Sequence, residues 1–367
     1  EYIMKRVLTF ILVLSMVLGS IGMISAAPAL EDVLGTKYED AVERLASLSI
    51  LEGYPDGTFR PDADITRAEF AAAVVRAKGL ESAAEAGKGS ATGFTDVPGS
   101  HWASGYVGTA AKLGIVNGIG NDLFAPEALV KYEEAVTMVM RALGYDPAAQ
   151  DKGGYPFGYL ITASETGLLD KVKGTQGIAA PRGLVAQLLD NALEIPLMVR
   201  VSYGDRIEYV VSGTKDVDEK TLLDEMDFVS IEGVVTDIAR VSSLKKNQIR
   251  IDNKVYKVVG DVDYEAVFGT EVKAWLNDDD EVVFVKIESD DVYFDAVEWN
   301  SSKEELKLKD SGVKYDLARN VNVLIDGSKK KVSDLSSEYD YAKVVLNDDG
   351  DVVFIDAYNW DGFIVVE

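Results

Sequence analysis

Residues 50–79 read ILEGYPDGTFRPDADITRAEFAAAVVRAKG, and this stretch joins a tight turn to the start of a helix. Thr66 and Glu69 have the spacing of a capping box. In such a box the threonine hydroxyl accepts a hydrogen bond from the glutamate N–H, and the carboxylate accepts one from the threonine N–H. The pattern predicts a helix that begins at about Arg67. Apolar residues from Phe70 onward recur every three or four positions, as in a helix that packs one face into a core.

The loop before this helix has the composition of a fixed corner. Pro55 and Gly57 occupy the second and fourth positions of a four-residue turn that starts at Tyr54. Proline and glycine at these two places favour a type I turn. Phe59 follows directly and offers an apolar anchor, so we expect the loop to be pinned to the core.

Length and composition limit the classes of protein. The 367 residues are too many for one typical core, so we expect two to four domains, and 47% hydrophobic residues exclude general disorder. The formal net charge of −25 argues against nucleic acid as a partner, since phosphate binding needs a basic surface. The absence of cysteine excludes disulfides and thiolate metal sites, and the single histidine, His101, disfavours imidazole metal sites and Ser-His-Asp triads.

Residues 1–27 are expected to be a signal peptide rather than part of the fold. A short basic start leads into an almost continuous apolar run over residues 7–24, and Ser25, Ala26 and Ala27 supply the small residues of a cleavage site. A retained membrane anchor is the alternative, because a run of this length can span a bilayer. The small-residue ending favours cleavage, so the protein is expected to be exported, with no membrane contact after the signal is removed.

The opening stretch has a partner 65 positions later. This shift superposes six residues of the first copy on identical residues of the second without a gap: Gly53 on Gly118, Phe59 on Phe124, Pro61 on Pro126, Glu69 on Glu134, Arg76 on Arg141 and Gly79 on Gly144. A further amphipathic helix precedes each copy, over residues 38–49 and 102–113. A third, degraded copy is expected at about residues 155–194. The predicted repeats are residues 28–84, 92–147 and 153–196, separated by glycine-rich links at 84–93 and 146–154.

The tandem arrangement of helix, GYPDGTFRP loop, ITRAE helix start, FTDV and HWA resembles the S-layer homology (SLH) domain of bacterial surface-layer proteins. The resemblance covers about residues 30–195. It implies a spindle of three repeats whose grooves hold the secondary cell-wall polysaccharide attached to peptidoglycan. It also implies that a pyruvate ketal on a wall sugar offers a carboxylate to these grooves.

Arg67 is the first candidate for binding this carboxylate. A guanidinium at the first position of a helix lies beside backbone N–H groups that favour anions, and it can hold a carboxylate with two hydrogen bonds. A structural salt bridge between repeats is the alternative. The third copy keeps this residue as Arg182 but has Leu184 in place of the capping glutamate. The second copy has Tyr132, which lacks the positive charge but can stack on a sugar ring.

Four further residues complete the predicted ligand-binding set. Tyr38 and Trp102 precede the first helix of copies one and two, where each ring either lies flat against a pyranose or fills the joint between helices. The sequence leaves these two roles open. Asp32 and Asp96 come shortly before the same helices, and a cap or turn role is favoured for them over contact with sugar.

From residue 197 onward, β-branched and aromatic residues alternate with polar ones, which predicts strands. The segment WLNDDDEVVFV at 275–285 recurs at 345–355 as VLNDDGDVVFI. Both predict strand, tight turn and strand, because Asn and Asp tolerate the positive φ angles of hairpin turns. We expect two β modules, at 197–288 and 289–358. Residues 359–367 are expected to begin a further unit or form a terminal strand, with the natural protein continuing beyond them.

The fold class predicted from these patterns is multidomain α+β, a helical three-repeat spindle followed by all-β modules. The acidic turns at 277–281 and 347–351 offer oxygens that suit calcium, but they lack the downstream glutamate of an EF-hand. Solvated hairpin turns are therefore favoured, and no cofactor is expected, although weak calcium binding shared between molecules stays open. No pair of carboxylates stands out for glycoside hydrolysis, so no catalysis is expected.

The predicted function is that of a secreted protein of the cell wall or surface layer. Its partners would be the wall polysaccharide and copies of itself in a lattice, with the β modules contributing to assembly. The alternative is an SLH-anchored enzyme or adhesin whose active region lies in or beyond the β half.

Overall fold

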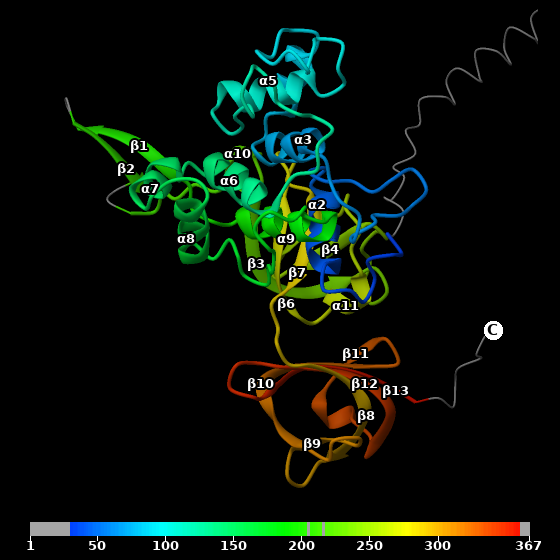
Figure 1. The fold of residues 1–367 in the computed structure, drawn as a ribbon. Coiled ribbons are helices and arrows are strands. Elements are labelled where there is room, and N and C mark those ends of the chain that lie inside the picture. The colour runs from blue at the N-terminus through cyan, green and yellow to red at the C-terminus, as the bar shows by residue number, and fades with distance from the viewer. Residues whose placement is uncertain (1–29, 204–205, 215–216, 360–367) are drawn as a thin grey trace, which may run out of the picture.

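The computed structural model describes residues 30–203, 206–214 and 217–359, and Figure 1 shows helices followed by strands along the chain. This order confirms the predicted fold class. The predicted signal peptide and nearly all of the expected further unit lie outside the described residues. None of the described helices is long and apolar enough to cross a membrane.

The helical part is built from three pairs of helices of matching length. In each pair a helix of 9 residues is followed by a loop and a helix of 11 residues. The first pair is α2 (Glu39–Ser47) and α3 (Arg67–Ala77), the second is α5 (Ser104–Lys112) and α6 (Tyr132–Ala142), and the third is α8 (Phe157–Glu165) and α9 (Arg182–Ala192).

The capping box predicted for Thr66 and Glu69 is present. Thr66 accepts from the N–H of Glu69 at 3.2 Å, and the Glu69 carboxylate accepts from the N–H of Thr66 at 2.8 Å. Helix α3 begins at Arg67, as predicted. The preceding turn is closed by the N–H of Gly57, which donates to the carbonyl of Tyr54 at 2.9 Å.

The three helix pairs close into a ring through their loops. In each pair the residues just before the 11-residue helix form antiparallel bridges with the corresponding stretches of the other two pairs. The bridges join Thr66 to Leu129, Lys131 to Ala179, and Pro181 to Asp64. Each pair therefore contacts both others, and the starts of α3, α6 and α9 lie at the three junctions.

Two segments that the sequence analysis took for glycine-rich links contain short helices. These are α4 (Glu81–Gly87) and α7 (Asp146–Asp151). Glycine lies only at the end of α4, behind a run of alanine and glutamate that favours a helix. Pro147 lies in the first turn of α7, where its missing N–H costs nothing.

The β half begins with a separate hairpin. Strands β1 (Met198–Tyr203) and β2 (Arg206–Val211) pair only with each other and project from the left of the molecule in Figure 1. The base of the hairpin is fixed to the second helix pair, because the N–H of Met198 donates to the carbonyl of Leu143 at 2.9 Å. A short helix, α10 (Leu222–Glu225), follows.

Two sheets make up the rest of the chain, and we call them the first and second β modules. The first has the strand order β5-β4-β3-β6-β7, and the second has the order β11-β10-β13-β12-β8-β9, in which β9 also pairs with β10 and closes a barrel. The first consists of β3 (Val229–Ile238), β4 (Gln248–Ile251), β5 (Lys254–Lys257), α11 (Tyr264–Val267), β6 (Glu271–Leu276) and β7 (Val282–Ile287). The second consists of β8 (Val292–Asn300), β9 (Glu305–Leu308), β10 (Lys314–Ile325), β11 (Ser328–Lys330), the 3-10 turn Val332–Asp334, β12 (Glu338–Leu346) and β13 (Val352–Tyr358).

The repeated WLNDDDEVVFV segment forms the strand, turn and strand predicted for it, as β6–β7 and again as β12–β13. In both turns an asparagine oxygen accepts a backbone N–H four residues later, at 2.9 Å for Asn277 and 2.8 Å for Asn347. The fourth turn residue has a positive φ, 60° at Asp280 and 82° at Gly350. The turns are thus shaped by their own side chains.

Each β module packs on the preceding unit through this same hairpin. Trp275 of β6 is fully buried in the core of the helical part, and the guanidinium of Arg44 lies 4.3 Å from its ring. One module later, Phe354 of β13 packs edge-on against Phe268 of the first module at 4.9 Å. The helices and the two modules are therefore joined by buried contacts as well as by the chain.

Candidate functional site

A groove of about 340 Å³ opens beside Arg67, where parts of all three helix pairs meet. Arg67 comes from α3, and the second pair supplies residues 116–119 and one face of α6. Tyr155, which precedes α8 of the third pair, completes the wall. Its ring is 54% exposed, and so is 59% of Ile119, so the groove has an accessible apolar rim.

Arg67 forms the floor of this groove and is bonded across the junction. Its Nε donates to the carbonyl of Phe124 at 3.0 Å, one terminal nitrogen donates to the carbonyl of Asn117 at 3.4 Å, and the other pairs with the Glu134 carboxylate at 3.2 Å. The structural salt bridge weighed in the sequence analysis is therefore present. A guanidinium has five N–H groups, and three contacts leave donors for a ligand.

Arg141 provides a second positive charge on the same wall. Its Nε donates to the hydroxyl of Tyr159 at 3.0 Å and pairs with Asp146 at 3.3 Å. With its amide oxygen turned toward Arg141, Asn117 accepts from both terminal nitrogens at 3.1 and 3.2 Å. The groove thus contains two arginines that are held in place from behind.

Tyr155 lies between opposite charges at the groove rim. Burial and the nearby carboxylates of Glu133 and Glu134 raise the pKa of Tyr155 above its usual range. The hydroxyl is therefore a neutral hydrogen-bond donor at neutral pH, and the half-exposed ring offers a flat apolar face. Such a ring suits a sugar, which presents C–H groups on one face and hydroxyls at its edge.

Arg182 repeats the bonding of Arg67 at the junction between the third and first pairs. It donates to the carbonyls of Phe59 at 2.9 Å and Glu52 at 3.0 Å, residues that lie 65 positions before Phe124 and Asn117. Burial lowers the pKa of Arg182. Its guanidinium lies 4.8 Å from the centre of the Tyr54 ring, and that of Arg60 lies 4.1 Å from the same ring. The ring therefore covers the arginine at this junction.

Tyr132 occupies the third junction and is buried, with 8% of its surface exposed. A Cβ at Gly174 would collide with the ring, so the tyrosine fills the space left by the shorter loop of the third pair. Burial raises the pKa of Tyr132. The structure thus gives this ring little surface for stacking on a sugar.

Asp32 and Asp96 hold the loops of their own helix pairs. Asp32 accepts from the backbone N–H groups of Phe59 and Arg60 at 2.7 and 2.6 Å. Asp96 accepts from the equivalent N–H groups, those of Phe124 and Ala125, at 2.9 and 2.7 Å. These contacts correspond to the turn role that the sequence analysis favoured.

The two aromatic candidates lie in different surroundings. Tyr38 is half-buried at the start of α2, and a Cβ at Gly183 would collide with its ring, so it packs on the first turn of α9. Trp102 lies one residue before the N-cap of α5 and is 48% exposed. Of the two, only Trp102 has a large free ring surface.

Sequence reasoning missed Tyr155, Ile119 and Asn117 as groove residues. At two of them the copies differ, because the second copy has Ile119 and Asn117 where the first has Tyr54 and Glu52. Tyr155 carried a signal, since a shift of 53 positions superposes it on Trp102, along with Gly158 on Gly105 and Tyr159 on Tyr106. Arg141 did carry a signal, since it superposes on Arg76 in the 65-residue shift. It was not recognised because the wall of the groove is formed only when three separate segments meet.

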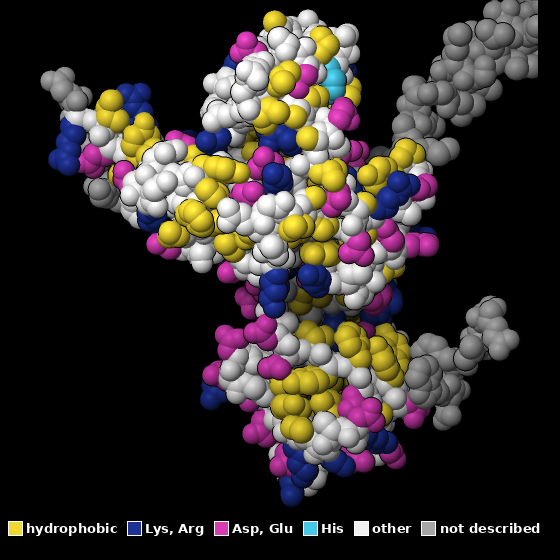
Figure 2. Space-filling model, in the orientation of Figure 1, with side chains coloured by type: hydrophobic (Ala, Val, Ile, Leu, Met, Phe, Trp, Pro, Cys, Tyr) yellow, Lys and Arg dark blue, Asp and Glu magenta, His cyan; other side chains and the backbone are white. Residues whose placement is uncertain are grey.

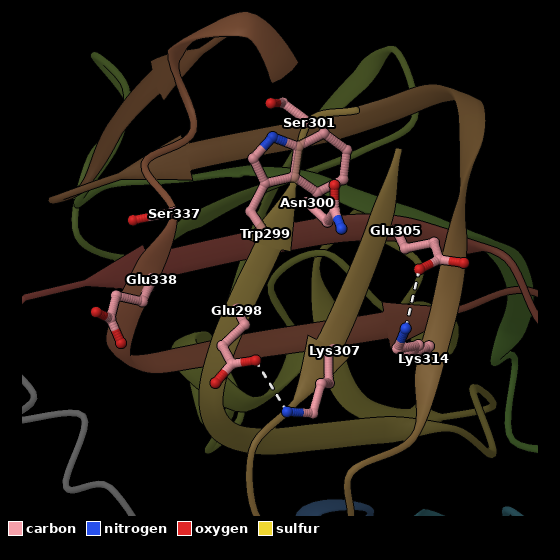
Figure 3. A pocket seen from close by; sticks show the side chains of 9 residues that line it. All are labelled: Glu298, Trp299, Asn300, Ser301, Glu305, Lys307, Lys314, Ser337 and Glu338. Carbon is pink, nitrogen blue, oxygen red and sulfur yellow. Dashed lines mark hydrogen bonds and ion pairs between the residues drawn. The ribbon is translucent and has the colours of Figure 1, made fainter. Parts of the chain in front are cut away.

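A second hollow, of about 550 Å³, lies in the second β module around Trp299 (Figure 3). Its carboxylates are paired with lysines, Glu298 with Lys307 at 2.9 Å and Glu305 with Lys314 at 3.2 Å. The hydrogen bond from Lys307 lowers the pKa of Glu298. The general acid of a glycoside hydrolase needs the opposite shift, so this carboxylate does not suit that role.

No group of three or more acidic or histidine side chains in the described part of the chain is arranged to hold a metal ion. The acidic turns point their asparagine oxygens at backbone N–H groups instead, as described above.

Comparison with known proteins agrees with the geometry of the helical part. The S-layer homology domain matches residues 30–71 and 93–136, which contain α2 and α5, the loops that follow them and the starts of α3 and α6. The chain is 31% identical to the middle cell wall protein of Brevibacillus brevis over 406 residues, a match that covers 96% of this chain and 38% of that protein.

Two further relatives match both halves of the chain. The surface layer protein of Brevibacillus choshinensis is 30% identical over 94% of this chain and 35% of its own length. The cell surface protein of Thermoanaerobacter kivui is 28% identical over 97% of this chain and 46% of its own length. The chain thus spans less than half the length of each of these relatives. With its two S-layer homology matches and these relatives, the chain belongs to the family of proteins that carry S-layer homology domains.

Proposed function

We propose that this chain is an exported, non-catalytic cell-surface protein that its helical part fastens to a secondary cell-wall polysaccharide. The observation that carries the proposal is the groove at Arg67, in which two arginines lie beside a rim formed by the exposed side chains of Tyr155 and Ile119. The names of the three relatives, all of them wall or surface proteins, support the same location. We further propose that the β modules take part in assembling a surface layer.

The chemistry of the groove favours an anionic sugar as the ligand. Among the lining residues, Arg67 and Arg141 are basic and only Glu134 is acidic, while Asp146 pairs with Arg141 from behind the lining. A carboxylate on a sugar, such as a pyruvate ketal, would take the remaining guanidinium donors, while the Tyr155 ring covers the C–H face of the pyranose. The volume of about 340 Å³ falls at the small end of ligand pockets and suits one or two sugar units.

The three junctions are not equivalent in this proposal. Tyr54 covers Arg182, and Tyr132 fills its own junction, whereas Arg67 opens into the groove. Binding is therefore assigned first to the Arg67 groove. A single working groove predicts one polymer contact per chain rather than three.

Tyr155→Ala tests the groove without disturbing the core, because the ring is half exposed. We expect the variant to bind polymer-bearing cell walls about tenfold more weakly in co-sedimentation, since one ring stacked on a sugar contributes of order 1 kcal/mol. Phe157→Ala is the matched control, an aromatic residue that is 64% exposed, lies two positions away and does not line the groove. It should bind like the parent.

The nature of the ligand is tested with the wall instead of the protein. Walls stripped of the polymer should no longer retain the parent, and depyruvylated walls should retain it poorly. Equal retention on stripped and intact walls would contradict the proposed polymer ligand. Equal retention of the parent and Tyr155→Ala would move the binding site to another junction.

A further inference from the structure

The β1–β2 hairpin exposes one face that nothing in the described chain covers. The register pairs Arg200 with Tyr209 and Ser202 with Ile207, so these four side chains share a face. Tyr209 is 50% exposed and Ile207 is 49% exposed. Among the described residues, Arg200 makes no hydrogen bond or ion pair, and it carries the only charge on this face. The face is therefore apolar and positive on a chain whose net charge is −25.

Figure 2 shows the hairpin from one side. It stands out from the body of the molecule, and hydrophobic side chains lie beside basic and acidic ones along it. A patch of large exposed apolar residues is typical of a surface that contacts another protein. Tyrosine and arginine are also the side chains most enriched where proteins meet.

A crevice of matching character lies where the first helix pair meets the first β module. It has a volume of about 650 Å³ and is lined by α2, the loop at 52–55 and the segment 261–263. Tyr54, Pro55 and Phe284 form its apolar part. Its charged lining residues are all acidic, four carboxylates without a lysine or arginine among them, and Arg182 does not line it.

The acidic side chains of the crevice lack partners of opposite charge. Glu43 and Asp261 form no ion pair with any residue in the described ranges. Burial raises the pKa of Glu43, and the neighbouring carboxylates of Glu39, Asp40 and Asp261 raise it further. A guanidinium placed there would relieve this repulsion while an aromatic ring enters the apolar part.

We propose that the hairpin of one copy of this chain docks into the crevice of a second copy, with Arg200 among the carboxylates and Tyr209 and Ile207 against the apolar wall. The hairpin projects on the left in Figure 1, and the crevice lies between α2 and the segment before α11 on the other side. A contact between two different surfaces repeats head to tail, which gives a row of copies where the rotation between them does not close and a ring where it does. The inference deepens the proposed surface-layer role and rests on it.

The test uses the chain from residue 28 onward and measures self-association by sedimentation velocity over a concentration series. The parent should associate as its concentration rises. Arg200→Glu and Asp261→Lys should each weaken the association at least tenfold, because each places like charges together. Tyr209→Ser should weaken it as well. Lys303→Glu, the same change of charge at an exposed turn of the second β module, should associate like the parent.

Mixing the two charge variants separates this contact from all others. The Arg200→Glu copy keeps an intact crevice, and the Asp261→Lys copy keeps an intact hairpin, so an equimolar mixture should form heterodimers through one intact contact although neither variant associates alone. A parent that stays monomeric, an Arg200→Glu variant that associates like the parent, or a mixture that forms no heterodimer would each overturn the proposal. Both variants should still bind cell walls like the parent, whereas Tyr155→Ala should lose wall binding but keep self-association, so the two proposals fail separately.

Discussion

Arg67 shows how a residue can be central to a binding groove and still be a poor choice for mutation. It is 7% exposed and its guanidinium joins two helix pairs through Phe124, Asn117 and Glu134. Removing it would leave buried carbonyls without donors, which costs of order 1–3 kcal/mol for each group. Loss of wall binding in Arg67→Ala would therefore report damage to the junction as well as loss of a ligand contact.

Lys343 is, like Arg67, a buried cation that contacts a neighbouring unit of the chain. It joins the second β module to the first. It lies 5% exposed in β12, and its Nζ donates to the carbonyls of Glu265, Ala266 and Phe268 in the first β module at 2.9, 2.5 and 2.7 Å. Lys273 stands 70 positions earlier, at the equivalent place in β6, and pairs with Glu194 beyond the end of α9. A lysine on the same strand thus meets the preceding unit in both modules.

The pH dependence of stability should reveal Lys343. Burial lowers its pKa from 10.5 to about 8. Between pH 8 and 10.5 the unfolded chain therefore binds more protons at this site than the folded chain, so the free energy of unfolding rises with pH across this window. We expect the parent to gain of order 1 kcal/mol between pH 8 and 9.5 relative to Lys343→Met, measured by urea unfolding.

The pH range and control for this experiment follow from the neighbouring residues. Burial raises the pKa of Tyr341, so its ionisation in the unfolded chain lowers stability as the pH approaches 10, and measurements stop at pH 9.5 to limit this effect. Lys303→Met, at an exposed position, controls for the loss of one lysine. If the parent and Lys343→Met show parallel stability curves from pH 8 to 9.5, burial of the ammonium does not shift its titration.

The start of α3 contains the capping box of the repeated stretch. Thr66→Ala removes the side-chain half of its capping box and should lower the free energy of unfolding of the helical part by about 1 kcal/mol. Chemical unfolding followed by helical circular dichroism measures this loss. Thr175→Ala is the control, because Thr175 is exposed and its side chain makes no hydrogen bond within the described residues. A cost equal to that of the control would mean that the helix start is held by the loop bridges alone.

Elements fixed by nearby residues were predictable from the sequence. The cap at Thr66 and the turn at Asn277 depend on contacts within four positions, so their composition was sufficient. The ring of three loops and the short helices α4 and α7 were not foreseen. The ring and the two helices depend on tertiary contacts that local composition does not record. The glycines in these two segments favoured the prediction of links, although the alanines beside them favour helices.

The candidate site was predictable only in part for the same reason. Repetition identified Arg67 and its counterpart Arg182, and it placed Asp32 and Asp96 near turns. It could not tell that Tyr54 would cover Arg182 while Arg67 stayed open, since the ring at that place is supplied by another helix pair. The groove is a property of the junction between pairs, and no single repeat contains it.

At the scale of the whole molecule, the helical part and the first β module share one core. Trp275 of β6 lies in the same apolar cluster as the helices. The composition of the chain therefore changes near residue 197, but the packed core continues across that point. The charged network of Arg44, Glu194 and Lys273 surrounds Trp275. In the proposed function, anchoring and assembly are mechanically connected, because a load on the β half reaches the helical half through this contact.

Trp275→Ala tests that connection. The ring is fully buried, and truncation of a buried Trp costs about 3–5 kcal/mol, so the variant should lower the unfolding midpoint of the helical part although the change is in the β half. Circular dichroism at a helical wavelength during thermal unfolding measures the effect. Trp102→Ala, which removes a ring that is 48% exposed, should change the midpoint far less. If Trp275→Ala leaves the helical transition where it is in the parent, the two halves unfold independently and the shared core does not transmit load between them.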